Sequence, residues 1–294
     1  MTLPPPPPPP ADWPDLDHSV WHEVEGIRWH VQRQGRGPTL LLVHGTGGAT
    51  ASWAGATAAL AEHFDVVAVD LPGHGFTSVP STVERARDPY ALVGMARELG
   101  RLLQALHCRP QLAAGHSAGV SVLLRMTVDG TLAADHLLGF CPALVAPPAW
   151  YVALIAPLLG TLVERDVVAS EGARVAAATG LVRRMLASTG STLTATQLAR
   201  YAALCAMPTH VHAALTMMAR WDLPALYRDI HRLSTPLELI AARGDRWIPL
   251  APLTRAVAAI PGVTLRDEAG GHLLIEERPT VVVESLLRHH HRPR

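Results

Sequence analysis

A serine flanked by glycines is the first residue in this chain whose setting suggests chemistry. The pentapeptide GHSAG, residues 115–119, has the form G-x-S-x-G with Ser117 at its centre. In such a motif a crowded turn between a strand and a helix exposes the serine hydroxyl, and the glycines relieve the crowding. An apolar strand pattern precedes this motif and a helical pattern follows it, as that geometry requires. A turn serine that caps the next helix is the alternative.

A nucleophilic serine needs partners, because its free hydroxyl is a weak nucleophile at neutral pH. His272 follows the last strand pattern, and Gly270 and Gly271 would let a loop carry its ring over the sheet edge. Asp245 ends the strand pattern PLELIAARGD, at the edge where the serine also emerges. The other position for an acid, after HLLGFC, offers only Pro-Ala-Leu. We therefore predict that Ser117 is the nucleophile, Asp245 the acid and His272 the base.

The remaining histidines and acids near these residues have simpler interpretations. Most of the 16 histidines are expected on the surface or in packing, with His289 to His291 in a mobile tail. Asp267 and Glu268 lie close in sequence to His272 and are expected to be surface charges at a strand end.

Two backbone N–H groups are candidates to bind the oxyanion of a tetrahedral intermediate. One belongs to Ala118, directly after the serine, and the other to Thr46 in the loop HGTGG, residues 44–48. Removing one such donor typically costs roughly 100- to 1,000-fold in rate. The same loop is not a dinucleotide fingerprint, because the third glycine of G-x-G-x-x-G would fall at Thr50.

The elements that would position these residues alternate between strand and helix. Helical patterns are predicted around residues 53–63, 89–106 and 120–128. Strand patterns are IRWHVQRQ, TLLLVHG, FDVVAVD, PQLAAGH, HLLGFC, PLELIAARGD and VTLRDEAGGH, several of them continuously apolar. Such runs indicate strands buried on both faces, so we predict an α/β fold with a doubly wound, mostly parallel sheet.

Strand patterns stop between Ala146 and Leu226, where ATQLARYAALCAM and HVHAALTMMARWDL read as helices. We predict an extended Pro-rich arm at 1–18, a core at 19–145 and 227–294, and a helical cap at 146–226. Apolar and aromatic cap residues would suit a bulky flat or acyl substrate, although ordinary packing is an equal alternative. These candidate substrate-binding residues are Trp150, Tyr151, Met217, Met218 and Trp221.

The bulk composition excludes several classes of protein. The 294 residues are 49% hydrophobic with a formal net charge of zero, which argues against a nucleic-acid binder. Three widely spaced cysteines suggest neither a disulfide framework nor a zinc site, and we predict no metal and no cofactor. The uncharged stretch from Leu137 to Val163 contains four prolines, so one uninterrupted membrane-spanning helix is not expected.

The N-terminus has no basic region followed by an apolar stretch, so it does not resemble a secretory signal, and a cytoplasmic protein is expected. Seven consecutive prolines, Pro4 to Pro10, should form an extended polyproline II arm. An unstructured tail is favoured here over a ligand for a partner's aromatic groove.

Taken together, HGTGG, DLPGHGFT, GHSAG, GDRWIP and GGHLLIEERP follow the order and spacing of the α/β-hydrolases, from Ile27 to the C-terminus. More narrowly, ADWPDLDHSVW, GIRWHVQRQGRGP and MMARWDL resemble the magnesium-chelatase accessory hydrolases of bacteriochlorophyll biosynthesis (BchO). The resemblance implies an α/β-hydrolase fold, a role with magnesium porphyrins, magnesium-chelatase subunits as partners, and peripheral contact with the photosynthetic membrane. FCPA, residues 140–143, departs from the Asn-Gly pair expected there, which bears on the pocket rim.

Three functions remain open from the sequence. The first is a serine hydrolase acting on an ester-like bond, with a small-molecule substrate such as a magnesium porphyrin or a related ester. The second is a non-catalytic tetrapyrrole-binding accessory protein, in which His210 or His212 would offer an axial ligand; two exposed helix histidines are the simpler interpretation. The third is another reaction of this fold, of which carbon-carbon cleavage fits Ser117 better than dehalogenation, which commonly uses a carboxylate nucleophile.

Overall fold

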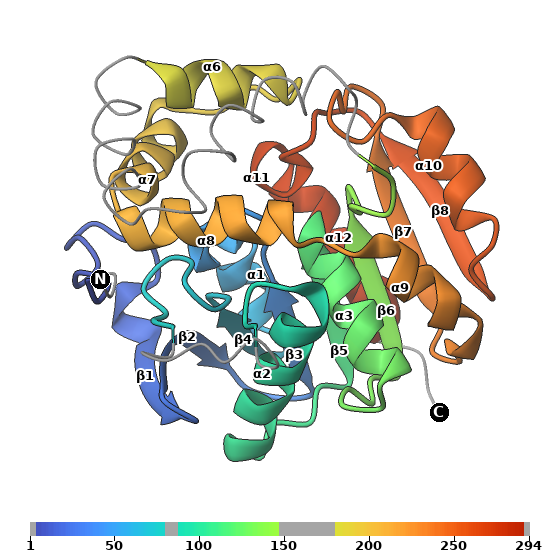
Figure 1. The fold of residues 1–294 in the computed structure, drawn as a ribbon, viewed down its shortest axis with the longest axis horizontal. Helices are drawn as coiled ribbons and strands as arrows, with labels where there is room; N and C mark the ends of the chain where they lie inside the picture. Colours follow the sequence, from blue (N-terminus) through green and yellow to red (C-terminus); the bar gives the residue numbers. More distant parts are fainter. Residues whose placement is uncertain (1–3, 80–87, 147–179, 291–294) are drawn as a thin grey trace.

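The computed structural model describes residues 4–79, 88–146 and 180–290. Its centre is an eight-stranded sheet in the order β1-β2-β4-β3-β5-β6-β7-β8 (Figure 1). The strands are β1 (Ser19–Val24), β2 (Ile27–Gly35), β3 (Thr39–Val43), β4 (Asp65–Val69), β5 (Leu112–His116), β6 (His136–Phe140), β7 (Leu237–Ala242) and β8 (Val263–Glu268). The predicted mostly parallel sheet is confirmed, because β3 to β8 run parallel and only β2 is antiparallel to its neighbours, β1 and β4.

Strand β1 was missing from the sequence prediction. Its burial pattern alternates weakly between partly buried and exposed residues, because it is an edge strand with a single neighbour, β2. The period-2 signal of SVWHEV is therefore weak, whereas the continuous apolar runs of β3, β4 and β5 reflect burial on both faces.

Helices cover both faces of the sheet (Figure 1). Each face has its own cluster of buried apolar side chains. One cluster includes residues of α2 (Leu92–Ala105), α3 (Ala118–Val128) and α10 (Leu250–Val257). The other includes residues of α1 (Thr57–Ala61), α11 (Leu274–Glu277) and α12 (Pro279–His290). The single helix predicted at 53–63 is instead a short 3-10 turn, Thr50–Trp53, followed by α1, and Gly55 lies in the break between them.

The described part of the predicted cap is helical: α6 (Leu181–Ser188), α7 (Ala195–Cys205), α8 (Pro208–Ala219) and α9 (Leu223–Asp229). Thr194 and Gln197 form a reciprocal capping box that starts α7. Pro208 occupies the first turn of α8, where the missing N–H costs nothing. In Figure 1, α6 lies at the top of the view, α7 to its lower left and α8 below both. Helix α9 leads back to the core strand β7.

The N-terminal arm is more ordered than predicted. The Thr209 hydroxyl of α8 donates to the carbonyl of Pro4 at 2.8 Å. Trp13 is 4% exposed and meets Phe76 edge to face in a cluster that includes Leu204 and Met207. The prediction of an unstructured tail is therefore wrong for residues 4–18, because one aromatic side chain anchors the arm between the core and the cap helices.

The predicted mobile histidine tail is also wrong for His289 and His290. Both residues complete α12. His289 Nε2 lies 2.8 Å from a carboxylate oxygen of Glu238, and the His290 ring packs against Phe64. His291 lies outside the described residues.

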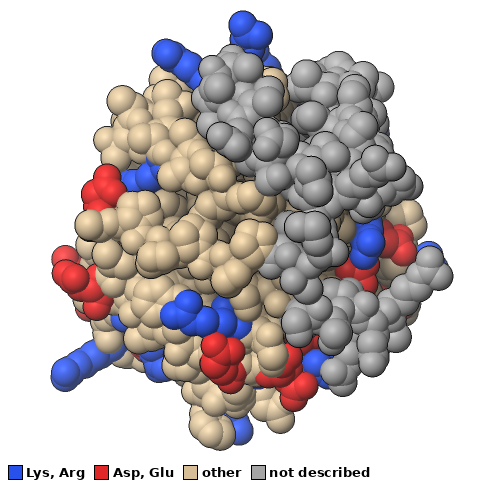
Figure 2. Space-filling view, turned by 60° about the vertical axis from the view of Figure 1, so that its left-hand side comes forward, with Lys and Arg blue, Asp and Glu red and all other residues tan. Residues whose placement is uncertain are grey.

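Surface charge matches the balanced composition. On the face shown in Figure 2, the middle of the described surface is uncharged, and basic and acidic side chains are interspersed nearer its margins. Among the described residues, no helix has the length and apolar character needed to cross a bilayer.

Candidate active site

Ser117 occupies a strained turn between β5 and α3. Its backbone has φ 51° and ψ −115°, a conformation that costs a non-glycine residue about 1–3 kcal/mol. Backbone hydrogen bonds hold it there: its N–H donates to Phe140 O at 2.9 Å, and its carbonyl accepts from Val120 and Ala143. The surrounding core thus forces the serine to project from the sheet edge.

The flanking glycines are required by close approach. A Cβ at Gly115 would lie 2.6 Å from the backbone nitrogen of Val120. A Cβ at Gly119 would lie 2.4 Å from the carbonyl oxygen of Val43. The G-x-S-x-G pattern therefore reflects helix α3 packed directly against β5 and β3, and the turn predicted from sequence is present.

The structure brings the three predicted residues together. His272 Nε2 lies 3.0 Å from Ser117 Oγ, and His272 Nδ1 lies 2.7 Å from Asp245 Oδ2. All three residues are buried. The arrangement gives the serine a base within hydrogen-bond reach and gives that base an orienting carboxylate, which is the geometry that acyl transfer through serine requires.

Asp245 is fixed by the turn that follows β7. Its Oδ1 accepts hydrogen bonds from the backbone N–H groups of Trp247 and Ile248, both at 2.8 Å. These bonds leave Oδ2 directed at His272. The Trp247 ring also packs against the imidazole of His272, with ring centroids 5.3 Å apart.

His272 is held by its backbone from two sides. Its carbonyl accepts a hydrogen bond from His116 Nε2 at 2.8 Å. Burial lowers the pKa of His116 to about 3, so this neighbour stays neutral and donates without adding charge. From the other side, the N–H of His272 donates to the carbonyl of Thr189, at 3.2 Å.

Thr189 belongs to a cap segment, residues 188–192, that we call the cap bridge. The Thr189 carbonyl also accepts from the N–H of Arg246, beside Asp245. Ser191 Oγ accepts from the N–H of Leu273, beside His272, at 2.8 Å. The cap bridge thus ties the loop of Asp245 to the loop of His272. Sequence reasoning missed this contact, because nothing in STGST indicates which loops it touches.

The loop of the predicted oxyanion donor lies beside the serine. A Cβ at Gly45 would be 2.8 Å from Ser117 Cβ, so Thr46 follows a residue in contact with the turn of Ser117. The Thr46 hydroxyl donates to the sulfur of Met217 at 3.3 Å. Ala118 is the first residue of α3, where N–H groups have no intrahelical acceptor and carry partial positive charge.

The buried carboxylate of Asp70 fixes the backbone next to the HGTGG loop through hydrogen bonds, a role that sequence reasoning did not assign. Its carboxylate accepts from the N–H groups of Thr50 and Phe76 and lies 2.7 Å from His30 Nδ1. The His30 partner lowers the pKa of Asp70 against the opposing effect of burial. A buried carboxylate at the end of β4 therefore links the 3-10 turn that follows the HGTGG loop to the DLPGHGFT loop.

His210 is a buried core contact, so the interpretation as an exposed helix histidine is wrong. It is 2% exposed. Its Nδ1 accepts from the N–H of Gly75 at 3.0 Å, and its Nε2 lies 3.2 Å from the carbonyl of Gly47. Both ring nitrogens are therefore engaged, which leaves none for a porphyrin magnesium. His212 is half-buried and packs near the ring of Tyr90.

The predicted substrate-binding residues divide into three groups. Trp150 and Tyr151 lie outside the described residues. Met217 is fully buried and joins the main apolar cluster, against which Trp221 also packs. Met218 is half-buried. Packing is thus the observed role of Met217, although its contact with Thr46 also places it beside the candidate oxyanion loop.

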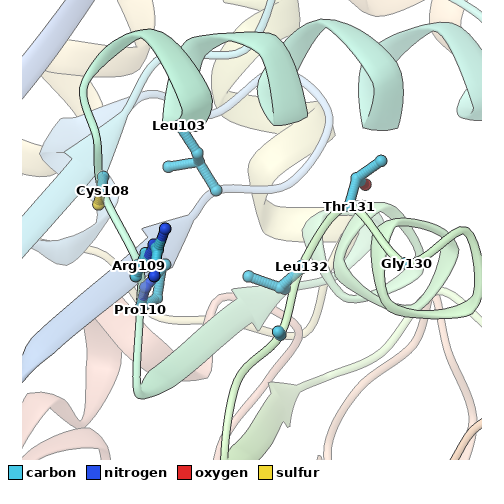
Figure 3. A pocket seen from close by; sticks show the side chains of 8 residues that line it. Leu103, Cys108, Arg109, Pro110, Gly130, Thr131 and Leu132 are labelled. Atoms are coloured by element: carbon cyan, nitrogen blue, oxygen red, sulfur yellow. The ribbon is translucent and has the colours of Figure 1, made fainter.

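A cavity of about 270 Å³ lies at the opposite edge of the sheet from Ser117 (Figure 3). It is lined by residues before the amino end of β5 and after α3, among them Leu103, Cys108, Arg109 and Leu132. Burial raises the pKa of Cys108 to about 11, which disfavours the reactive thiolate. Since Ser117 follows the carboxyl end of β5, this cavity is separate from the candidate active site.

Comparison with known families and proteins agrees with the fold and with the sequence resemblance. The family model described as "Alpha/beta hydrolase family" matches residues 40–285. The magnesium-chelatase 30 kDa subunit of Rhodobacter capsulatus is 33% identical over 276 residues, which cover 90% of this chain and 92% of that protein. A pimeloyl-[acyl-carrier protein] methyl ester esterase of Methylococcus capsulatus is 33% identical over 122 residues, or 41% of this chain and 44% of the esterase.

Among solved structures, an alpha/beta hydrolase fold protein from Burkholderia ambifaria superposes with a TM-score of 0.76. It is 23% identical and covers 92% of this chain and 98% of its own. This likeness supports the fold alone.

Proposed function

The chain belongs to the alpha/beta hydrolase family, and from this premise we propose that it is a serine hydrolase acting on an ester-like bond. The observation that carries the proposal is the continuous path from Ser117 Oγ to His272 Nε2, at 3.0 Å, and from His272 Nδ1 to Asp245 Oδ2, at 2.7 Å. Ser117 sits in a strained backbone conformation at the start of this path.

In the proposed reaction, Ser117 Oγ attacks the carbonyl carbon while its proton passes to His272 Nε2. Asp245 holds the other ring nitrogen, so the imidazole keeps the tautomer that can accept this proton. The N–H groups of Ala118 and Thr46 bind the oxyanion. The intermediate collapses when His272 returns the proton to the leaving alcohol. Water then attacks the acyl-enzyme with His272 as base, which releases the acid and restores Ser117.

We further propose that the substrate belongs to bacteriochlorophyll biosynthesis, as a magnesium porphyrin or a related ester, and that magnesium-chelatase subunits are partners. The support is the 33% identity to the magnesium-chelatase 30 kDa subunit over nearly the whole of both chains. A tetrapyrrole carries carboxyl side chains around an apolar ring, so an ester of this class would present the carbonyl that Ser117 needs and a flat apolar body for the cap.

The alternative function, tetrapyrrole binding without turnover, has less support in the geometry. The engagement of both ring nitrogens of His210 removes one of its two candidate ligands. A titration with magnesium protoporphyrin tests this alternative: saturable binding by a Ser117→Ala protein, with no ester turnover by the wild type, would favour it over hydrolysis.

The proposed function is tested with short-chain aryl esters and with methyl esters of porphyrins. Ser117→Ala should lower ester turnover roughly 10,000-fold. Ser234→Ala is the matched control, because this serine is exposed in the loop before β7. Comparison with a ring-opened diketone separates ester hydrolysis from carbon-carbon cleavage. Turnover that survives in Ser117→Ala, or that is found only with the diketone, would overturn the proposal.

A further inference from the structure

Cys141 is a buried thiol beside the candidate active site that the proposed mechanism does not use. It directly follows β6, the strand between β5, which carries Ser117, and β7, which leads to Asp245. Its backbone is held at φ 46°, and its N–H donates to Ile240 O at 2.8 Å. Its sulfur points to the base loop, where it contacts the carbonyl of Gly271 at 3.7 Å.

This placement makes a three-ligand cluster with two residues of the candidate active site. The Cys141 sulfur, a carboxylate oxygen of Asp245 and a ring nitrogen of His272 all lie within 4.8 Å of one another, and all three residues are buried. The wide sequence spacing of these residues hid the cluster, and the three cysteines alone gave no sign of a zinc site.

We propose that Cys141, Asp245 and His272 form an inhibitory site for a thiophilic divalent cation such as Zn²⁺. Thiolate, imidazole and carboxylate are the ligands that zinc takes in proteins, at about 2.3 Å for sulfur and about 2.0–2.2 Å for nitrogen and oxygen. In a tetrahedral site such donors stand about 3.3–3.7 Å apart. Side-chain adjustments of about 1 Å would therefore bring the three donors into position around one ion.

Thiol chemistry favours zinc or cadmium over magnesium at this site. Magnesium prefers oxygen donors and holds its waters, whereas a thiolate selects softer ions. Burial and the nearby Asp245 carboxylate raise the pKa of the Cys141 thiol well above its ordinary value in the metal-free protein. The ion must therefore displace the thiol proton of Cys141, because the thiolate is the ligand.

The inhibitory effect follows from the imidazole tautomer and rests on the proposed hydrolase function. Asp245 Oδ2 now lies 2.7 Å from Nδ1 of His272, which fits a proton on Nδ1 and a free lone pair on Nε2. A metal bound at Nδ1 moves the remaining ring proton to Nε2. That nitrogen then cannot accept the proton of Ser117, and the serine loses its base.

Two measurements on the full-length protein test the site. The first is the rate of Ser117 labelling by a fluorophosphonate, with and without micromolar ZnCl₂, in wild type, Cys141→Ala, Cys141→Ser, Cys108→Ala and Cys205→Ala. We expect zinc to slow labelling of wild type at least tenfold and EDTA to restore it. In each Cys141 variant, the labelling rate with zinc should stay within about twofold of the rate of the same variant without zinc. Cys108→Ala and Cys205→Ala should be slowed by zinc as wild type is.

The second measurement is independent of any activity. Titration with CdCl₂ should give a thiolate-to-cadmium charge-transfer absorption at one ion per chain in wild type, Cys108→Ala and Cys205→Ala, and none in Cys141→Ala. Zinc inhibition that persists in Cys141→Ala, or an absorption band that survives there or is missing from wild type, would overturn the site. If wild type is not labelled at all, the proposed function fails while the cadmium titration still decides the metal site.

Discussion

The two halves of the candidate active site are held by different parts of the molecule. Ser117 is positioned by the core alone: backbone bonds from Phe140, Val120 and Ala143 fix its strained turn. Asp245 and His272 are positioned by the core and by the cap bridge, whose Thr189 carbonyl accepts hydrogen bonds from both of their loops. The position of Ser117 should therefore tolerate changes in the cap, and the positions of Asp245 and His272 should not.

The difference suggests how the cap could matter to chemistry as well as to substrate selection. A cap that only covers a pocket would change KM when altered. A cap that also aligns the base, through backbone contacts with residues 246, 272 and 273, would change kcat.

Removing Ser117 and His272 together should lower kcat little more than removing either residue alone. His272→Ala should lower ester kcat roughly 10,000-fold, as Ser117→Ala does, and the double variant should be little worse than either, because the two residues act as one unit. Initial rates at saturating ester measure this. A double variant whose loss equals the product of the two single losses would show that the residues act independently.

Gly190→Ala should damage the base side without affecting the serine side. Gly190 has φ +82°, and an added Cβ would lie 2.1 Å from the carbonyl oxygen of Gly244. The cap bridge would have to shift, so we expect kcat to fall about 10- to 100-fold. Gly180→Ala is the matched control, because Gly180 has φ +66° in the same cap but no atom of the described residues lies within 4 Å of an added Cβ.

For this pair, kcat of Gly180→Ala should stay within about twofold of wild type, and circular dichroism should show both variants folded. Equal kcat values for the two alanine variants would contradict the alignment role of the cap bridge.

Acid should weaken the junction between the cap and the core. Burial lowers the pKa of His210 to about 4 from its ordinary 6.5, and burial also lowers the pKa of His44 and His74. Below pH 6.5 the unfolded chain binds protons that the folded chain excludes, so stability falls as pH falls. His210 alone should contribute a loss of about 2 kcal/mol between pH 6.5 and pH 5.

Urea unfolding of wild type and His210→Gln at these two pH values measures this contribution. The variant should lose less stability on acidification, because glutamine does not titrate. An unchanged pH dependence in His210→Gln would show that this histidine is not kept neutral by its burial at the junction.

Ser191→Ala should give the smallest effect. It leaves the N–H of Leu273 without its acceptor in a buried position, which costs about 1 kcal/mol of stability and a few-fold in kcat. The pH profile of kcat/KM should shift as well if alignment of His272 is disturbed. Ser191→Thr, which keeps the hydroxyl, should restore both; a threonine variant as impaired as alanine would point to packing instead.

The same contrast explains which parts of the site could be predicted from sequence. The nucleophile turn is local, so GHSAG between an apolar strand and a helix was enough to find Ser117. Asp245 and His272 were found because they end or follow strand patterns at one sheet edge. The contacts of Thr189, Ser191 and Cys141 with these loops depend on how distant segments pack, which no local pattern records.

The burial of His210 could not be predicted from the sequence for a related reason. His210 lies on a helix whose sequence pattern gives no clear apolar face, and its partners, Gly47 and Gly75, come from two loops far away in the chain. Likewise, the proline arm was predicted as a tail because its composition is typical of tails, while Trp13, which anchors it, is a single residue outside any periodic pattern.

The most direct test of the central claim, that Ser117 is activated by His272 and Asp245, is fluorophosphonate labelling followed by intact-mass spectrometry. One probe should attach per wild-type chain, and both Ser117→Ala and His272→Ala should lose the added mass while remaining folded. A folded wild-type protein that gains no mass, or a Ser117→Ala protein that still gains it, would contradict the account.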